Sequence, residues 1–360
     1  MAKFTEIFED VTKKGVKIPS NLYLDTGLYP IIDQGQSAIA GYTNKADGLF
    51  FDVPAIIFGD HTRIFKYVEK PCFLGADGVK LLKAKKPNAN HKYLYYALCN
   101  ADIPNTGYNR HFKWLKEVDI PEYSEEEQED IVLKLDKISH LIALRKRQLS
   151  KLDELVKSRF VEMFGDLVTN NKNWSFAPLG NVCDVRDGTH ASPKYHAAGY
   201  PLMTSKNFTN GYEDFSDVKL ISKEDFIEIN RRSRVDLGDI VMPMIGTIGC
   251  PVIIKSNREF AIKNVSLIKF TSESPINIFV KVVLSSHYFK RIVQKTNRGN
   301  TQKFIALGDI RDFPFPLPPL ALQREFAAFV EKVDKLEFKA KASLEKLETL
   351  KKAMMQKYFG

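Results

Sequence analysis

Two loop-like stretches of this 360-residue chain carry the residue types that contact nucleic acid. Arg and Lys suit guanine edges and phosphates, whereas Asn and Gln suit adenine edges. One stretch runs from Gly107 to Lys113 and the other from Arg298 to Phe304. An ordinary solvated loop explains any single polar residue here equally well. The candidate contact residues are Asn109, Arg110, His111, Lys113, Arg298, Asn300, Thr301, Gln302 and Lys303.

Lys206 and Asn207 form a further candidate pair. Basic residues also cluster at Lys13–Lys14 and between Arg231 and Arg234, where a solvated face is as good an explanation as a phosphate contact. Lys and Arg number 53 against 44 Asp and Glu, a formal charge of +9. A positive balance favours an anionic partner such as double-stranded DNA, although many proteins are this basic.

Motifs for catalysis are absent from the sequence. Neither G-x-x-x-x-G-K-[ST] nor G-x-G-x-x-G occurs, and there is no G-x-S-x-G nucleophile elbow or Asn/Asp-Pro-Pro-aromatic motif. The four cysteines are far apart, and His190 and His196 lack partners at metal-ligand spacing. We therefore expect no catalytic residues, no metal and no cofactor in this chain.

The composition favours a soluble, cytoplasmic protein. Hydrophobic residues make up 44% and charged residues 27%, which is the globular range. The uncharged stretch 240–254 is interrupted by Pro and Gly and is shorter than the ~20 apolar residues of a membrane span. Charged residues near Met1 argue against a secretory signal. Widely spaced cysteines fit reduced thiols.

Short apolar runs bounded by Gly and Pro predict strands that position the polar loops. Residues 239–242 and 251–254 read as a hairpin, and 265–270 as a further strand. Residues 93–98 and 278–284 read as short helices. The fold class is therefore α+β, with mixed or β-rich globular domains.

Two 40-residue helices repeat one another at a fixed offset of 195 positions. Both segments, about 125–165 and 321–360, lack an internal Pro or Gly. Gln128 falls on Gln323, and Phe164 on Phe359, without a gap. Such register over a whole helix indicates a tandem duplication.

The segments before the helices also repeat, at an offset of 192, which matches Phe112 with Phe304 and Leu115 with Leu307. The organisation is thus domain, helix, domain, helix. We place the first domain at 1–120, the central helix at 121–166, the second domain at 167–316 and the C-terminal helix at 317–360.

Each long helix carries an apolar seam with alternating spacings of four and three residues, which predicts pairing along its length. At 1.5 Å per residue, ~40 residues form a rod of about 60 Å. Two domains joined by such a rod suggest a pseudo-two-fold body with two half-sites at a fixed separation. Two ordinary amphipathic helices, each packed on its own domain, are the alternative. The predicted pairing residues are Ile131, Leu135, Ile138, Ile142, Leu149, Leu152, Val156, Phe326, Val330, Val333, Leu344 and Leu347.

An ordered series of motifs in the second half resembles the specificity subunit of type I restriction-modification systems. Asp187-Gly188-Thr189-His190 opens the series, and Lys206-Asn207 follows in its usual place. Gly246-Thr247-Ile248-Gly249 comes next, and Gly299-Asn300-Thr301-Gln302 leads into the Pro-Leu-Pro-Pro run before Gln323. In the first half, Ile120-Pro121-Glu122-Tyr123 replaces that run, and the opening motif is absent.

The resemblance implies two target recognition domains, each of which reads one half of a bipartite, asymmetric DNA sequence. The helices would pair as an antiparallel coiled coil, set the spacer and dock two methyltransferase (modification) subunits. Those partners would supply S-adenosylmethionine, and restriction subunits would supply ATP-dependent cleavage. This chain would contribute recognition without catalysis.

Two alternatives stay open at this point. A specificity subunit serving a fused type II restriction-methylation enzyme would look identical in sequence. A coiled-coil adaptor that joins proteins and does not bind DNA would share the helices and the basic charge. DNA binding through several phosphates weakens steeply as salt rises, which separates the adaptor from the other two.

Overall fold

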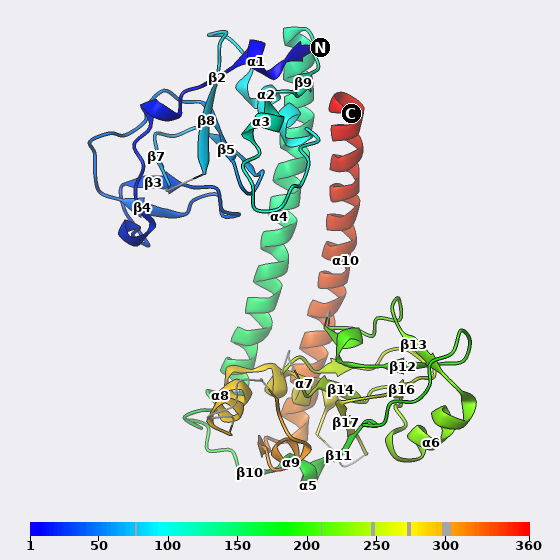
Figure 1. Cartoon of the computed structure of the whole chain (residues 1–360). Coiled ribbons are helices and arrows are strands. Elements are labelled where there is room, and N and C mark those ends of the chain that lie inside the picture. The colour runs from blue at the N-terminus through cyan, green and yellow to red at the C-terminus, as the bar shows by residue number, and fades with distance from the viewer. Residues whose placement is uncertain (76–77, 210, 246–248, 272–274, 297–303) are drawn as a thin grey trace. The chain divides into compact units, whose positions relative to one another are not determined.

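The computed structural model describes the chain apart from residues 76–77, 210, 246–248, 272–274 and 297–303. It divides into two compact units, which we describe separately. Unit 1 comprises Met1–Gln148 and Ala340–Gly360, and unit 2 comprises Leu149–Lys339. Each unit therefore holds one globular domain together with part of each long helix (Figure 1).

Helix α4 spans Glu125–Phe164 and begins with a capping box. The Ser124 hydroxyl accepts from the Glu127 amide at 3.3 Å, and the Glu127 carboxylate accepts from the Ser124 amide at 2.9 Å. Three glutamates in the first turn suit the positive end of the helix dipole. Gly165, with φ of 75°, ends the helix in the left-handed conformation that glycine adopts freely.

Helix α10 spans Leu320–Phe359 and follows Pro318 and Pro319. Its first turn is held by the buried Gln323, whose side-chain amide donates to the Pro318 carbonyl at 2.8 Å. At the equivalent place in α4, Gln128 donates to the Tyr123 carbonyl at 2.9 Å. Both predicted long helices are confirmed, and so is their repeat offset of 195.

The domain of unit 1 contains three small sheets, ordered β1-β9, β2-β8-β5-β6 and β4-β3-β7. Helix α2 lies on the side of the four-stranded sheet that faces α4 (Figure 1). The strands are β1 Ala2–Lys3, β2 Phe8–Asp10, β3 Tyr29–Ile32, β4 Gly41–Thr43, β5 Ala55–Gly59, β6 Phe65–Val68, β7 Phe73–Leu74, β8 Val79–Ala84 and β9 Asp119–Ile120. The helices are α1 Phe4–Ile7, α2 His91–Cys99 and α3 Phe112–Leu115, with 3-10 turns η1 Thr12–Lys14 and η2 Ser20–Leu22.

The domain of unit 2 repeats this order as β10-β18, β11-β17-β14-β15 and β13-β12-β16. The strands are β10 Phe176–Pro178, β11 Asp184–Asp187, β12 Tyr200–Met203, β13 Lys219–Ile221, β14 Ile240–Pro243, β15 Val252–Ile253, β16 Ala261–Ile262, β17 Val265–Lys269 and β18 Pro314–Pro316. The helices are α5 Leu179–Val182, α6 Lys223–Ser233, α7 Asn277–Ser285, α8 His287–Thr296 and α9 Leu307–Arg311, with the 3-10 turn η3 Ser205–Phe208.

The matching strand orders confirm the duplication. Each three-stranded sheet contains one parallel pair, β3 with β7 and β12 with β16, and its other pair is antiparallel. The predicted hairpin, the strand at 265–270 and the two short helices are likewise confirmed as β14-β15, β17, α2 and α7. The fold class is α+β, as predicted.

Strands β5 and β14 lie inside the four-stranded sheets and are buried on both faces, which explains their continuous apolar runs. In β5, Ile56 and Phe58 join the core beside the long helices, whereas Ala55 and Ile57 join a core on the opposite face. This is the two-residue alternation of a strand. In β14, Ile240 and Val241 divide between two cores in the same way.

The seam residues of both long helices face protein. Ile131 and Leu135 pack with residues between Met354 and Phe359 in unit 1, and Phe160 and Phe164 pack with Phe326 in unit 2. Within unit 1, Arg145 contacts Ser343 at 3.2 Å, so the paired segments run antiparallel. All twelve predicted seam positions are buried or half-buried, namely Ile131, Leu135, Ile138, Ile142, Leu149, Leu152, Val156, Phe326, Val330, Val333, Leu344 and Leu347.

Candidate nucleic-acid interface

In unit 1, the turn between β5 and β6 forms the base of the first polar loop. Gly59 and Ile64 close this hairpin through a hydrogen bond of 2.9 Å from the Gly59 amide to the Ile64 carbonyl. Arg63 adopts φ of 62° and donates from its guanidinium to the Ile103 carbonyl at 3.0 Å. The turn is therefore tied to the segment that leads into the loop at 104–111.

His111 was predicted to contact DNA, but its position in the structure does not favour that contact. Its ring is fully buried, and Nδ1 donates to the Asp60 carbonyl at 2.9 Å. Nε2 lies 3.4 Å from the Thr106 amide, which donates to it. The Asp60 carboxylate in turn accepts from the Phe112 amide at 2.7 Å. With both nitrogens used, His111 fastens the loop to the hairpin and has no group left for a base.

Asn109, Arg110 and Lys113 are exposed, as a DNA contact requires. The Asn109 side-chain amide donates to the Thr106 carbonyl, so its nitrogen is engaged. Lys113 lies with its ammonium 5.0 Å from the centre of the Trp114 ring. These three residues remain candidates.

Two residues that sequence reasoning missed stand beside them. Tyr108 is 88% exposed, and its ring stacks on that of His61 with centroids 4.7 Å apart and an angle of 9°. Tyr108 lies in the polar loop already singled out, but His61 is far from it in sequence. Nothing in the sequence pairs the two rings.

In unit 2, Asn207 is buried, which does not favour its predicted contact with DNA. Its side-chain oxygen accepts from the Thr204 amide at 2.9 Å, while its amide donates to the carbonyls of Asp214 at 3.0 Å and Asp217 at 3.1 Å. Asn207 thus holds η3 and the loop that follows. Its neighbour Lys206 is exposed and remains a candidate.

Five candidates of the second polar loop lie outside the described residues. They are Arg298, Asn300, Thr301, Gln302 and Lys303.

At the end of β11, the structure brings together Asp187 and His190 of the opening motif and Arg232 of the basic cluster at 231–234. The two carboxylate oxygens of Asp187 accept from Arg232 at 2.7 Å and contact His190 Nε2 at 2.9 Å. His190 Nδ1 lies 2.9 Å from the Asn264 side-chain oxygen. Asp187 is 17% exposed at its side chain, whereas His190 and Arg232 are each 65% exposed. A nearly buried carboxylate therefore holds two exposed donors in place, which suits contact with an anion.

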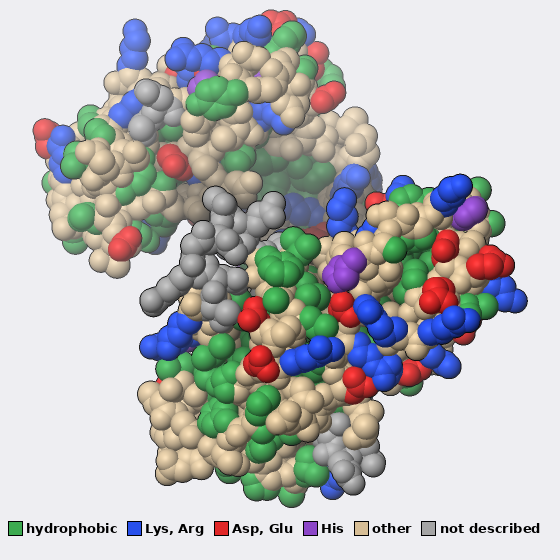
Figure 2. All heavy atoms as spheres, turned by 60° about the horizontal axis from the view of Figure 1, so that its bottom comes forward, with side chains coloured by type: hydrophobic (Ala, Val, Ile, Leu, Met, Phe, Trp, Pro, Cys, Tyr) green, Lys and Arg blue, Asp and Glu red, His purple; other side chains and the backbone are tan. Residues whose placement is uncertain are grey.

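Helix α6 adds Arg231 and, just beyond its end, Arg234 to this side of unit 2. Both side chains are exposed and paired with nearby acids, Glu228 at 2.7 Å and Asp236 at 3.2 Å. Figure 2 shows Lys and Arg gathered, with Asp and Glu among them, over the side of unit 2 that carries α6. Exposed pairs of this kind exchange readily for phosphate contacts.

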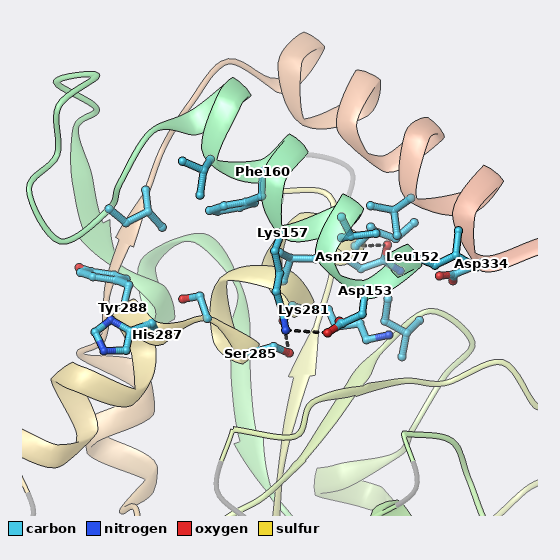
Figure 3. A pocket seen from close by; sticks show the side chains of 18 of the residues that line it. Leu152, Asp153, Lys157, Phe160, Asn277, Lys281, Ser285, His287, Tyr288 and Asp334 are labelled. Carbon is cyan, nitrogen blue, oxygen red and sulfur yellow. Dashed lines mark hydrogen bonds and ion pairs between the residues drawn. The ribbon is translucent and has the colours of Figure 1, made fainter. Parts of the chain in front are cut away.

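A cavity of about 1050 Å³ opens beside the long helices of unit 2. Its walls come from α4, α7, α8 and α10, and Figure 3 shows Phe160 and Lys157 pointing from α4 toward α7. Lys157 donates to Asp153 at 2.6 Å at the rim. The floor includes apolar side chains such as Leu152 and Val330. An apolar floor with a charged rim suits a protein segment better than a nucleic acid.

Metal ligands and cysteine thiols are the reactive groups to consider among the described residues. They contain no group of three or more His, Cys, Asp and Glu placed to hold a metal. Burial raises the pKa of the Cys72 and Cys183 thiols to about 12, so neither is a thiolate at neutral pH. Within the same residues, no helix combines the length and apolar character that crossing a bilayer requires.

Comparison with known proteins agrees with this arrangement. The family model of the type I restriction modification DNA specificity domain matches residues 1–154 and 171–349. The MjaVIII specificity subunit of Methanocaldococcus jannaschii is 26% identical over 315 residues, which cover 79% of this chain and 74% of that protein. The EcoR124I/EcoR124II specificity subunit of Escherichia coli is 30% identical over 149 residues, 38% of this chain and 36% of that protein.

The fold also matches a solved structure. The S subunit of a type I restriction-modification system from M. genitalium superposes with a TM-score of 0.66 at 16% identity. The match covers 100% of this chain and 95% of that one. At this level of identity the match supports the fold: two sheet-rich domains with long paired helices.

Proposed function

The chain belongs to the family of type I restriction-modification specificity subunits, their non-catalytic DNA-recognition component, and we propose that each domain reads one half of a bipartite, asymmetric target. The duplication carries this proposal. Both domains repeat one strand order, while the polar stretches that precede α3 and α9 differ in sequence, Tyr108-Asn109-Arg110 in the first and Asn300-Thr301-Gln302 in the second. Two domains that read different half-sites need the same fold with different residues in the loops that contact the bases.

We assign the spacer between the half-sites to the long helices. Each helix has 40 residues and belongs in part to both units. A helix rises 1.5 Å per residue, so its length fixes a separation along the DNA. Insertion of four residues between Ile138 and Leu149, about one turn, should lengthen the tolerated spacer and leave both half-sites unchanged.

The partners are double-stranded DNA and two methyltransferase subunits, joined by restriction subunits where the system cuts DNA. The cavity beside α7 supports docking of a modification subunit on unit 2, because it combines an apolar floor with charged residues at its rim. S-adenosylmethionine and ATP would be bound by those partners rather than by this chain. The assembly would act in the cytoplasm, where the DNA is.

The direct test is to map methylated adenines in a host that expresses the chain with its methyltransferase subunits. We expect a bipartite motif that disappears when the chain is deleted. Methylation that persists unchanged would contradict the proposal and favour the adaptor alternative. The family membership already argues against that adaptor. A fused type II partner can be distinguished, because a single polypeptide would then both methylate and cleave the DNA.

A further inference from the structure

Tyr108 in unit 1 is an exposed aromatic ring whose position is fixed from several sides. The turn that carries it is closed by hydrogen bonds from the Asn109 amide to the Gly107 carbonyl at 2.9 Å and from the Gly107 amide to Asn105 Oδ1 at 3.2 Å. The Asn109 side chain closes the same turn onto the Thr106 carbonyl. The side chain is thus 88% exposed on a backbone that hydrogen bonds hold on both sides.

His61 supports the ring from behind. The two rings are nearly parallel at 9°, so the imidazole covers one face of the phenol and leaves the other face open. His61 Nδ1 donates to the Asn109 carbonyl at 3.2 Å, because a carbonyl can only accept. The His61 amide donates to Gln34 at 3.2 Å. His61 therefore joins the hairpin turn to the loop at the point where Tyr108 projects.

The fold itself makes little use of Tyr108. Among the described residues, no hydrogen bond involves its hydroxyl, and the ring belongs to none of the hydrophobic cores. Its surroundings suit a polyanion, since Arg110, Lys113 and Lys116 are exposed nearby and residues 108–116 contain no acid. A rigid, open aromatic face among cations is a combination typical of nucleic-acid contact.

We propose that Tyr108 is a base-contacting residue for the first half-site and that His61 is its positioning residue. The open face of the ring packs against a base or base step of duplex DNA, as the apolar side chains of DNA-bending proteins do, and the hydroxyl remains available as a donor. Because His61 already holds the ring in one orientation, less side-chain conformational entropy is lost when DNA binds. This inference rests on the proposed function and adds which residue makes the contact.

The test uses the full chain assembled with its methyltransferase subunits. Methylation and binding are measured on duplexes that carry the motif mapped for the unmodified chain, with each base altered in turn. Tyr108→Ala should weaken target binding by at least about fivefold, the lower end of what loss of a base-stacked ring costs. It should also reduce discrimination in the first half-site and leave the second unchanged.

Matched variants separate contact from structure. Phe51→Ala is the control, because it removes a ring that is 68% exposed and precedes β5, whereas His61 follows β5. This variant should behave like the unmodified chain. His61→Ala should approach the Tyr108→Ala result, and His61→Phe, which keeps a flat ring, should restore most of the binding. Tyr108→Leu keeps apolar bulk without a flat face and should remain defective.

Salt dependence identifies what Tyr108 touches. Loss of a base contact leaves the slope of log K against log salt unchanged, whereas Arg110→Ala should lower that slope by about one if it meets a phosphate. First-half discrimination that survives Tyr108→Ala or Tyr108→Leu would overturn the inference. Absence of any bipartite motif with the unmodified chain would instead overturn the proposed function and this inference with it.

Discussion

The two units build the same contact beside the long helices from residues at equivalent positions. In unit 1, the rings of Tyr93 and Phe359 lie 5.4 Å apart, and in unit 2 the rings of Phe279 and Phe164 lie 4.7 Å apart. Tyr93 and Phe279 each occupy the third position of a nine-residue helix, α2 or α7. The packing that joins domain to helix is thus retained in both copies.

The surface next to this contact differs between the units. In unit 1, the Tyr96 hydroxyl donates to Asp136, so side chains bridge the space between α2 and α4. In unit 2, the equivalent residues Val282 and Glu331 line the open cavity. Core positions tolerate little change, whereas neighbouring surface positions are free to diverge. The two units therefore have different surfaces at this place.

The largest expected difference concerns the aromatic core of unit 2. Phe326 is fully buried against Phe160 and Phe164, so Phe326→Ala should lower the free energy of unfolding of unit 2 by about 3–5 kcal/mol. Ile131→Ala, the corresponding change in unit 1, should lower the free energy of unfolding of that unit by less. Each unit holds one tryptophan, Trp114 or Trp174, so replacement of the other tryptophan by Phe lets fluorescence during denaturant unfolding follow one unit at a time. Equal losses of unfolding free energy for Phe326→Ala and Ile131→Ala would contradict this expected difference between the units.

The paired glutamines should differ next. Gln323 is 2% exposed and also accepts from the Ile276 amide at 3.0 Å, so Gln323→Ala leaves a buried donor and acceptor unpaired. We expect a loss of about 2–3 kcal/mol in unit 2. Gln128→Ala changes a half-buried position and should lower the free energy of unfolding of unit 1 by about 1 kcal/mol. The same fluorescence assay measures both, and a larger loss for Gln128→Ala would refute this ordering.

Filling the cavity should weaken partner docking at unit 2. Val282→Tyr introduces the residue that unit 1 has at this place, and we expect about tenfold weaker binding of a modification subunit, equal to about 1.4 kcal/mol. Isothermal titration of the chain with that subunit measures the change. Val282→Ile, which hardly alters the volume, is the control. Undiminished affinity with Val282→Tyr would place docking elsewhere.

The smallest effect concerns pH. Burial lowers the pKa of His91, whose Nε2 has no hydrogen-bond partner among the described residues. The folded state stays neutral while the unfolded chain takes up a proton, so stability should fall as the pH drops below about 6.5. Unit 2 has Asn277 at this position and should lack this contribution. His91→Asn should therefore flatten the acid dependence of unit 1, as measured by amide exchange in α2; an unchanged slope would argue against His91 as the source.

The framework could be predicted because a repeat constrains many residues at once. An offset of 195 relates the glutamines, the seam and the ends of both helices. The offset of 192 proposed before the helices is wrong, because the fully buried counterpart of Leu115 is Ile310. The Phe4 amide donates to the Val118 carbonyl just as the Leu179 amide donates to that of Phe313, which again gives 195. Loosely matched loop residues had obscured this register.

Roles of single polar residues could not be predicted in the same way. His111 and Asn207 have the side chains that read bases, and the same groups also satisfy buried backbone amides and carbonyls. Only burial separates the two uses. Conversely, His61 and Tyr108 meet through tertiary structure, and local sequence gives no sign of their stacking.

Exchange of one domain tests the central claim most directly. Residues 1–120 are replaced by the first domain of a family member that has a different target, and methylated adenines are mapped in a host expressing the hybrid with the methyltransferase subunits. The account predicts a motif in which one half changes while the other half and the spacer stay as in the unmodified chain. A motif altered in both halves, or in neither, would contradict it.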